Sequence, residues 1–162
     1  MTNPEIDMAE VRRLSKLSVE KILENSPVVD ISLENYWSTV RGRKKPLAVF
    51  FYSNNDEYSQ RVATLIKYIS HDYTNNIAFT RVKVAENGKP DRATATKLAS
   101  HFGLDKTPGI LFYDNTGSEM VLEDEKNVTP DFKEFRTPKM ILWKTYYSAV
   151  RRELDQLIGV HP

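Results

Sequence analysis

The chain has 162 residues, about the length of one domain and enough to bury a substantial core. With 40 % hydrophobic and 28 % charged residues, its composition is that of a globular protein and not of a disordered one. The 23 basic and 22 acidic residues nearly cancel, so no charge excess favours nucleic acid or an anionic membrane surface. No apolar run approaches the roughly 18 to 20 residues that span a bilayer. The first residues include acidic side chains and lack the apolar core of a secretory signal peptide. We therefore expect a cytoplasmic protein without membrane insertion.

Cysteine is absent. This excludes disulfides, thiolate nucleophiles, iron–sulfur ligation and cysteine-type zinc sites. The three histidines, His71, His101 and His161, are far apart in the sequence and have no metal-ligand spacing. We therefore predict neither a metal nor a cofactor.

Residues 5 to 24 have the pattern of a single amphipathic helix. Ser15 and Ser18 interrupt its apolar face, which consists of Met8, Val11, Leu14, Val19, Ile22 and Leu23. We interpret residues 1–26 as a helical extension of a domain that spans residues 27–162. The helix either packs on its own domain, which we favour narrowly, or docks on a partner: a second copy of the chain, or a larger complex that could itself be membrane-bound.

After Pro27, residues 28–31 form a short strand candidate, and Ser32 can cap a helix from Leu33 to about Val40. Four of the next five residues, Arg41-Gly42-Arg43-Lys44-Lys45, are basic. Such a run can bind phosphate or an acidic partner, but it is more often a solvated turn before a buried strand.

The centre of the chain is a strand, a polar turn and a helix. Leu47 to Tyr52 is a continuous apolar run, typical of a strand that is buried on both faces. In the turn at residues 53–56, Asn55 or Asp56 can cap a helix over residues 57–73, whose apolar residues recur at helical spacing. Open α/β sheets place their functional sites at such a junction.

The remaining elements continue the alternation of strand and helix. We expect a strand over residues 77–84 and a helix capped by Asp91, which ends at Gly103 and carries Ala95, Leu98, Ala99 and Phe102 inward. A strand over 110–113, a turn at 114–117 and an antiparallel strand over 118–122 follow. After a polar loop, Thr137-Pro138 starts the last helix, which has a wide aromatic stripe.

This order of elements resembles the thioredoxin family from about Val28 to Ile158. Two stretches carry the resemblance: VFFYSNNDEYSQRVATLI, and the segment from Phe102 to Phe112 that contains Thr107-Pro108. The resemblance implies an α/β thioredoxin-like fold, with a central mixed sheet flanked by helices and the N-terminal helix as an addition. It also implies a cis bond between Thr107 and Pro108, beside a groove for an extended peptide.

The sequence departs from the family at the redox site. Where thioredoxins have Cys-x-x-Cys, this chain has Asp56-Glu57-Tyr58-Ser59, so Asp56 replaces the nucleophile and Ser59 the resolving cysteine. The buried acid of the family falls at Phe50, and the helix proline falls near Thr64. Thiol–disulfide exchange needs a thiolate, which neither a carboxylate nor a hydroxyl can replace.

A thioredoxin-like domain without thiols is expected to be an interaction module: an adaptor, a chaperone-like factor or an accessory subunit. Such a module would bind a protein or peptide in the groove at Thr107 and Pro108, partly through backbone hydrogen bonds. The alternative is an enzyme that performs non-thiol chemistry around residues 56–59. Asp56 and Glu57 would point about 100° apart in a helix, and capping explains them better than acid–base catalysis. A buried carboxylate in a cleft would favour the enzyme, and a capping Asp56 would favour the module.

Overall fold

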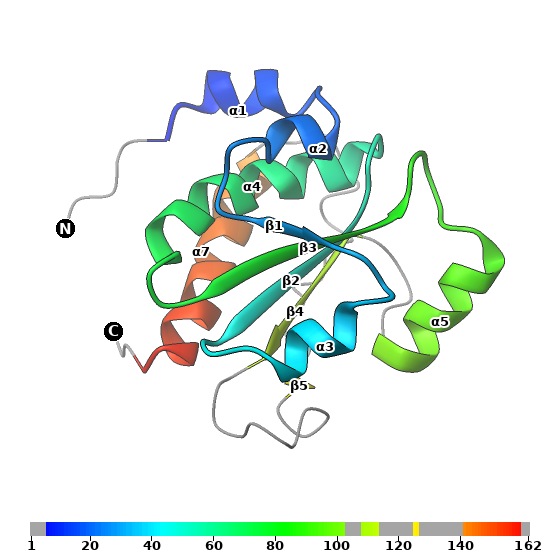
Figure 1. Ribbon diagram of the computed structural model, residues 1–162. Helices are drawn as coiled ribbons and strands as arrows, with labels where there is room; N and C mark the ends of the chain where they lie inside the picture. The colour runs from blue at the N-terminus through cyan, green and yellow to red at the C-terminus, as the bar shows by residue number, and fades with distance from the viewer. Residues whose placement is uncertain (1–5, 103–107, 114–124, 127–140, 160–162) are drawn as a thin grey trace.

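The computed structural model describes residues 6–102, 108–113, 125–126 and 141–159. Five strands form one sheet in the order β1-β3-β2-β4-β5 (Figure 1). Their bounds are β1 Val29–Ile31, β2 Leu47–Ser53, β3 Ala78–Ala85, β4 Gly109–Tyr113 and β5 Glu125–Lys126. β1, β3 and β2 are parallel, whereas β4 is antiparallel to β2 and β5 is antiparallel to β4. The predicted mixed sheet is therefore confirmed.

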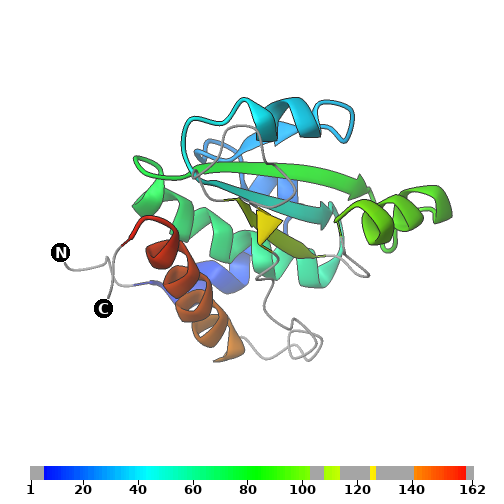
Figure 2. The ribbon, with the colours of Figure 1, turned by 90° about the horizontal axis from the view of Figure 1, so that it is seen from below.

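The helices cover both faces of the sheet. Their bounds are α1 Met8–Leu14, α2 Val19–Ile22, α3 Tyr36–Arg41, α4 Glu57–Tyr73, α5 Arg92–Phe102 and α7 Ile141–Leu157. Figure 2 shows α4 and α7 on one side of the strands and α3 on the other. Two hydrophobic cores result, one on each face of the sheet.

β2 is the central strand, and all seven of its residues are buried, as the apolar run predicts. Alternate side chains of a strand point to opposite faces. Ala48, Phe50 and Tyr52 accordingly join the core under α4 and α7, whereas Leu47, Val49 and Phe51 join the core under α3. This two-sided burial explains why the run shows no alternation of polar and apolar residues.

The N-terminal segment forms two short helices, so the expectation of a single helix over residues 5–24 is wrong. Asp7 caps α1 by accepting from the Ala9 N–H at 3.0 Å, and Ser18 caps α2 by accepting from the Lys21 N–H at 3.3 Å. Ser18 is extended, with ψ at 155°, which interrupts the helical hydrogen bonds. A serine hydroxyl can bond to nearby backbone N–H groups, which favours a helix start over a helix interior. Ser18 makes such a bond at the start of α2.

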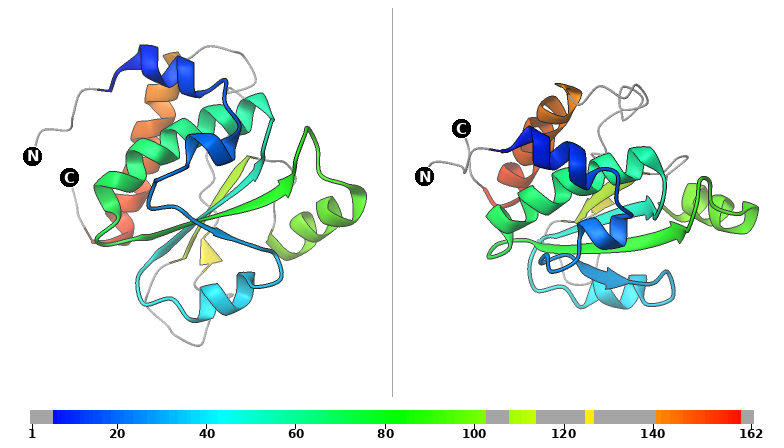
Figure 3. Two further views of the ribbon diagram at one scale, coloured as in Figure 1. Left: turned by 45° about the horizontal axis from the view of Figure 1, so that its top comes forward. Right: turned by 90° about the horizontal axis from the view of Figure 1, so that it is seen from above.

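Both N-terminal helices pack on α4 (Figure 3). Five side chains of this segment, four from the helices and that of Leu23 directly after α2, are at most 5 % exposed and belong to the same core as Phe50 and Leu65: Val11, Leu14, Val19, Ile22 and Leu23. The extension therefore covers its own domain, as the sequence analysis narrowly favoured.

Several local predictions need correction. The N-cap of α3 is Asn35 and not Ser32, whose hydroxyl instead accepts from the Asn35 N–H in the preceding turn. Ala95 is exposed and not inward, while Leu98 is buried as expected. The strand antiparallel to β4 includes residues 125–126, where a polar loop was expected. The strand expected at 118–122, Gly103 and Thr137-Pro138 lie outside the described residues, as do the side chains of Ala99 and Phe102.

Candidate functional site

Asp56, which the resemblance places at the first family cysteine, caps α4. Its carboxylate accepts from the Ser59 N–H at 2.9 Å, and its backbone is extended, as an N-cap requires. The predicted helix over residues 57–73 is confirmed. The Asp56 side chain therefore stabilises the start of a helix, which is the structural role that the sequence analysis favoured over catalysis.

The segment Asp56-Glu57-Tyr58-Ser59, which stands in place of Cys-x-x-Cys, is called the degenerate loop, and its other residues make separate contacts. Ser59 is fully buried, and its hydroxyl accepts from the Ser53 N–H at 3.1 Å, which joins the end of β2 to the first turn of α4. Glu57 is largely exposed and pairs with Arg61 one turn along the helix. Tyr58 is half-buried and packs against the core. Asp56 and Glu57 thus contact different partners and do not form an acid–base pair.

Asn54 joins three segments, and the sequence analysis did not single it out. It is 6 % exposed. Its backbone oxygen accepts from the Val19 N–H, and its Oδ1 accepts from the Glu20 N–H, both at 2.9 Å. These two donors belong to the first turn of α2, where amide groups have no partner within the helix. The loop therefore provides acceptors for the N-terminal extension.

The same loop also holds the end of β3. The Asn54 N–H donates to the Ala85 oxygen at 2.9 Å, and Asn54 Nδ2 donates to Glu86 Oε2 at 3.0 Å. Asn55 donates through its backbone and its side chain to the Glu86 oxygen, at 2.9 and 3.0 Å. The polar residues between β2 and α4 thus connect the carboxyl ends of two neighbouring strands.

A small ion-pair group surrounds this junction. Lys83 contacts the carboxylates of Glu86 and Glu20, the latter at 2.9 Å. These hydrogen bonds, first to Glu86 and then to Glu20, raise the pKa of Lys83 above its usual value. The hydrogen bonds from Lys83 and Asn54 lower the pKa of Glu86. Lys83, Glu20 and Glu86 therefore pair with one another beside the loop.

Pro108 is buried and directly precedes β4. Because Gly109 pairs with Phe51 in an antiparallel ladder, Pro108 lies at the carboxyl end of β2, the same edge of the sheet as the degenerate loop. Thr107 lies outside the described residues. The cis bond and the peptide groove at Thr107 and Pro108 therefore stay predictions.

Within the described ranges, no group of three or more histidine, cysteine, aspartate or glutamate side chains could hold a metal ion. No helix in that part of the chain is long and apolar enough to cross a membrane.

A family model described as a thioredoxin-like domain matches residues 33–124, which is more than half of the chain. The chain therefore belongs to the thioredoxin-like domain family. Because it contains no cysteine, it cannot catalyse thiol–disulfide exchange. The membership in this family and the absence of the Cys-x-x-Cys motif, both inferred from the sequence, are therefore confirmed.

Solved structures with thioredoxin folds are similar at low identity. A crystal structure of ERdj5 matches with a TM-score of 0.51 and 14 % identity over 82 % of this chain, which spans only 15 % of the ERdj5 chain. Thioredoxin of Trichomonas vaginalis matches with a TM-score of 0.47 and 16 % identity, over 75 % of this chain and 99 % of that one. Mitochondrial thioredoxin 3 of Saccharomyces cerevisiae gives 0.40 and 10 %, over 52 % and 72 % of the two chains. No curated protein sequence matches.

Replacing Asp56 by alanine should destabilise the protein by about 0.5 to 2 kcal/mol, because the Ser59 N–H loses its acceptor. Chemical denaturation measures the change, and Asp56→Asn, which keeps a capping oxygen, should recover most of it. If the midpoint of Asp56→Ala equals that of the wild type, the capping role is refuted and a catalytic role gains weight.

Replacing Asn54 by alanine should cost about 2 kcal/mol, because the Glu20 N–H and the Glu86 carboxylate each lose a side-chain partner in a part-buried hydrogen bond. Asn55→Ala is the matched control: Asn55 is exposed, so its loss should cost only about 0.5 kcal/mol. Equal effects of the two variants would show that the junction with α2 adds nothing to stability.

Proposed function

We propose that this chain is an interaction module: a thioredoxin-like domain that binds a partner protein or peptide instead of exchanging disulfides. It would act as an adaptor, a chaperone-like factor or an accessory subunit of a complex. The observation that carries the proposal is that polar residues of the degenerate loop, and of the turn before it, make structural contacts. Asp56 caps a helix, Ser59 holds the end of β2, and Asn54 holds α2 and β3, so each has a structural contact.

The partner site is assigned to the edge of the sheet where the loop and Pro108 lie together. An extended peptide can bind by strand addition through backbone hydrogen bonds, and such binding requires no thiol. The N-terminal extension borders this edge through the contacts of α2 with Asn54. Its exposed residues, including Lys21, would contact the same partner or a second copy of the chain.

The alternative is non-thiol catalysis around residues 56–59. Acid–base chemistry needs two groups that reach one substrate atom. The Asp56 carboxylate accepts from the Ser59 amide, and the exposed Glu57 carboxylate pairs with the buried Arg61 one turn along the helix. This arrangement supports the interaction module over the enzyme.

The proposal can be tested by photo-crosslinking in extracts of the native source. A benzophenone amino acid placed at Glu57, in the degenerate loop, should crosslink a defined protein that mass spectrometry identifies. The same group at Lys67, a half-exposed residue further along α4, serves as the control. If both positions capture the same background proteins, the partner site is not at the loop.

Insulin reduction by dithiothreitol should proceed at the same rate with and without this protein. The chain has no thiol that could attack the insulin disulfides. The turbidity of the released insulin B chain measures the reaction. Acceleration beyond the protein-free rate would contradict the assignment.

A further inference from the structure

β1 forms one edge of the sheet (Figure 1). It is the last strand in the sheet order and pairs only with β3 in the part of the chain that the structure describes. Val29 and Asp30 are both exposed, whereas every residue of the central strand β2 is buried. The outer edge of such a strand presents backbone N–H and C=O groups that an added strand can use. β1 therefore offers a place for an extended segment of another chain.

The side chains of β1 divide between the two faces of the sheet, because neighbouring residues of a strand point to opposite faces. Val29 and Ile31 line a hollow of about 550 Å³ at the amino ends of the parallel strands. Asp30 points to the other face, where it pairs with Arg81 at 3.8 Å. A strand added beside β1 would divide its side chains in the same way, since residues directly opposite each other share a face.

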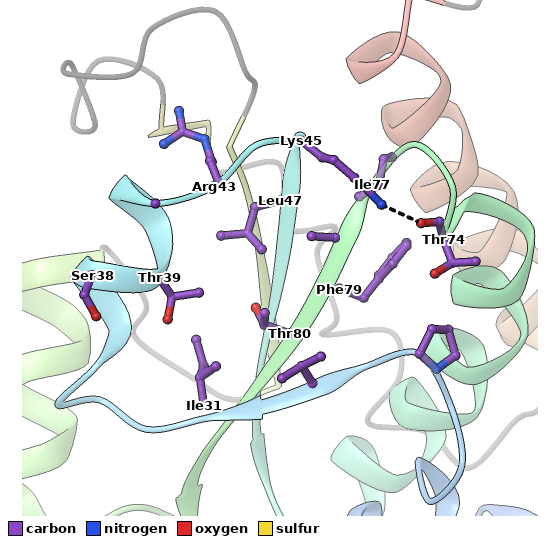
Figure 4. A pocket seen from close by; sticks show the side chains of 14 residues that line it. Ile31, Ser38, Thr39, Arg43, Lys45, Leu47, Thr74, Ile77, Phe79 and Thr80 are labelled. Carbon is purple, nitrogen blue, oxygen red and sulfur yellow. Dashed lines mark hydrogen bonds between the residues drawn. The ribbon is translucent and has the colours of Figure 1, made fainter.

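The hollow has a largely apolar lining. Figure 4 shows Ser38 and Thr39 of α3 on one side, Thr74 on the other, and Leu47, Thr80 and Ile31 between them. Its apolar side chains include those of Val29, Ile31, Leu47, Ile77 and Ala78. Val29 is 60 % exposed, so an apolar side chain of an added strand would remove apolar surface from water.

Three hydroxyl groups in the lining already have partners within the domain. The hydroxyls of Ser38 and Thr39 both donate to the Asn35 oxygen at 2.9 Å, and that of Thr80 donates to the Ala48 oxygen at 3.1 Å. These donors therefore need no polar group from a partner. We expect the residues of an added strand that face the hollow to be apolar.

On the opposite face, Asp30 favours a basic residue in the added strand. Its side chain is 65 % exposed, and within the described ranges its carboxylate has Arg81 as an ion-pair partner and no hydrogen bond. Arg81 lies on the inner side of β1, opposite Asp30 on β3, and its side chain is only 14 % exposed. Opposite charges directly across from each other stabilise strand pairing. A basic residue on the outer side of Asp30 would extend the alternation of charge to three neighbouring strands.

A second copy of β1 fits this edge poorly. Antiparallel pairing that uses all three residues of both copies places Asp30 opposite Asp30. Like charges directly opposite each other destabilise such a pairing. The edge therefore favours a segment of a different protein.

We propose that β1 binds an extended segment of a partner protein in which a basic residue lies between two apolar ones, and that this segment adds to the sheet as a strand. The apolar side chains pack over the hollow against Val29 and Ile31, and the basic side chain pairs with Asp30. Arg43 and Lys45, which line the hollow, lie on the apolar face and away from that pair. This inference rests on the proposed function and deepens it, because it gives the partner a chemistry and a second surface.

The test uses the full-length, ¹⁵N-labelled protein and the capped peptide Ser-Val-Lys-Val-Ser at millimolar concentrations. Nuclear magnetic resonance titration should perturb the amides of residues 29–31, 38–39 and 80, which belong to β1 and to the lining of the hollow. Residues 53–59, at the other end of the parallel strands, should stay unchanged. Added salt should weaken the binding, because the ion pair with Asp30 is exposed.

Three control peptides isolate the parts of the interaction. Ser-Val-Glu-Val-Ser places an acid opposite Asp30 and should bind at least about threefold more weakly. Val-Ser-Lys-Ser-Val has the same composition, but its valines share the face of the lysine, so it should bind about fivefold more weakly. The lysine peptide with N-methyl groups on its three central backbone amides keeps every side chain. It lacks the N–H donors for strand addition and should not bind.

Two variants test the residues, each with a matched control. Asp30→Asn should weaken binding of the lysine peptide about threefold and strengthen binding of the glutamate peptide by a similar factor. Glu34→Gln neutralises another exposed acid nearby and should change either affinity less than about twofold. Val29→Ser should weaken binding of the lysine peptide about fivefold, whereas Leu17→Ser, at an exposed apolar residue elsewhere, should leave it within about twofold. All four positions are exposed, so thermal melting should show folded variants.

The outcomes separate this inference from the proposed function. If the lysine peptide leaves residues 29–31 unchanged while the loop position still captures a partner, the inference is refuted and the proposed function stands. Binding at β1 without capture at the loop supports the inference and refutes the partner site at Pro108. Equally tight binding of the glutamate peptide refutes the role of Asp30, and binding of the N-methylated peptide refutes strand addition. Concentration-dependent shifts at residues 29–31 without peptide identify a second copy as the occupant and also refute the inference.

Discussion

Deletion of residues 1–26 is expected to lower the melting temperature by tens of degrees or to prevent folding. The deleted segment supplies five core side chains that are at most 5 % exposed. Burying each contributes about 1.5 to 3 kcal/mol, and the total is comparable with the 5 to 15 kcal/mol that stabilise a typical domain. The deletion also exposes the face of α4 that α1 and α2 cover. Circular dichroism melting of the truncated and full-length proteins measures the effect.

Point variants keep this prediction testable if the truncated protein does not fold. Ile22→Ala removes a fully buried side chain and should cost about 2 to 5 kcal/mol. Leu17→Ala, at a residue that is 38 % exposed, should cost less than about 1 kcal/mol. A truncated protein that melts like the full-length one would show that the extension serves a partner and not its own domain.

Tyr52→Phe should stabilise the protein against alkaline unfolding. Tyr52 is fully buried on β2, stacks on Phe50 at 5.4 Å, and has a hydroxyl without a hydrogen-bond partner in the described part of the chain. Burial raises its pKa from 10.0 to about 12, against the opposing effect of the Arg81 charge. The folded state therefore prefers the neutral phenol, whereas the unfolded state ionises near pH 10.

The higher pKa of Tyr52 in the folded state makes the stability of the protein depend on pH in the alkaline range. The contribution of Tyr52 to stability is fully present below pH 10 and is lost as the pH rises to about 12 and above. At about 1.4 kcal/mol per pKa unit, the loss approaches about 3 kcal/mol once Tyr52 is ionised in both states. Phenylalanine cannot ionise, so the alkaline midpoint of Tyr52→Phe should lie at higher pH than that of the wild type.

Near pH 7 the same variant should be as stable as the wild type or up to about 1 kcal/mol more stable, because it removes an unpaired buried hydroxyl. Tyr113→Phe is the matched control: Tyr113 is also fully buried, but its hydroxyl contacts that of Tyr36. Its loss should cost about 1 kcal/mol at pH 7. Unchanged alkaline midpoints in urea titrations of Tyr52→Phe would show that Tyr52 is already hydrated in the folded protein.

Local pattern predicted the elements whose determinants lie close together in the sequence. The seven buried residues of β2 appear as one apolar run, and the seventeen residues of α4 follow a capping aspartate. Asp91 likewise caps α5, with the Thr94 N–H at 2.8 Å from its Oδ1. Absent cysteines were equally decisive, because no tertiary contact can replace a thiolate. Short-range patterns therefore predicted the central strand and the helix starts, and the absence of cysteine by itself excluded thiol–disulfide exchange.

Only the tertiary structure decided how distant segments meet. Asn54 reads as one polar residue in a turn, yet its partners lie 34 residues before it, at Glu20, and 32 after it, at Glu86. The hollow at the amino ends of the parallel strands likewise combines residues of β1, α3, β2 and β3. The break at Ser18 also depends on distant contacts, because the amides at the start of α2 gain acceptors on the loop. Local propensity is a weak preference that such long-range contacts override, since most helical stability comes from packing.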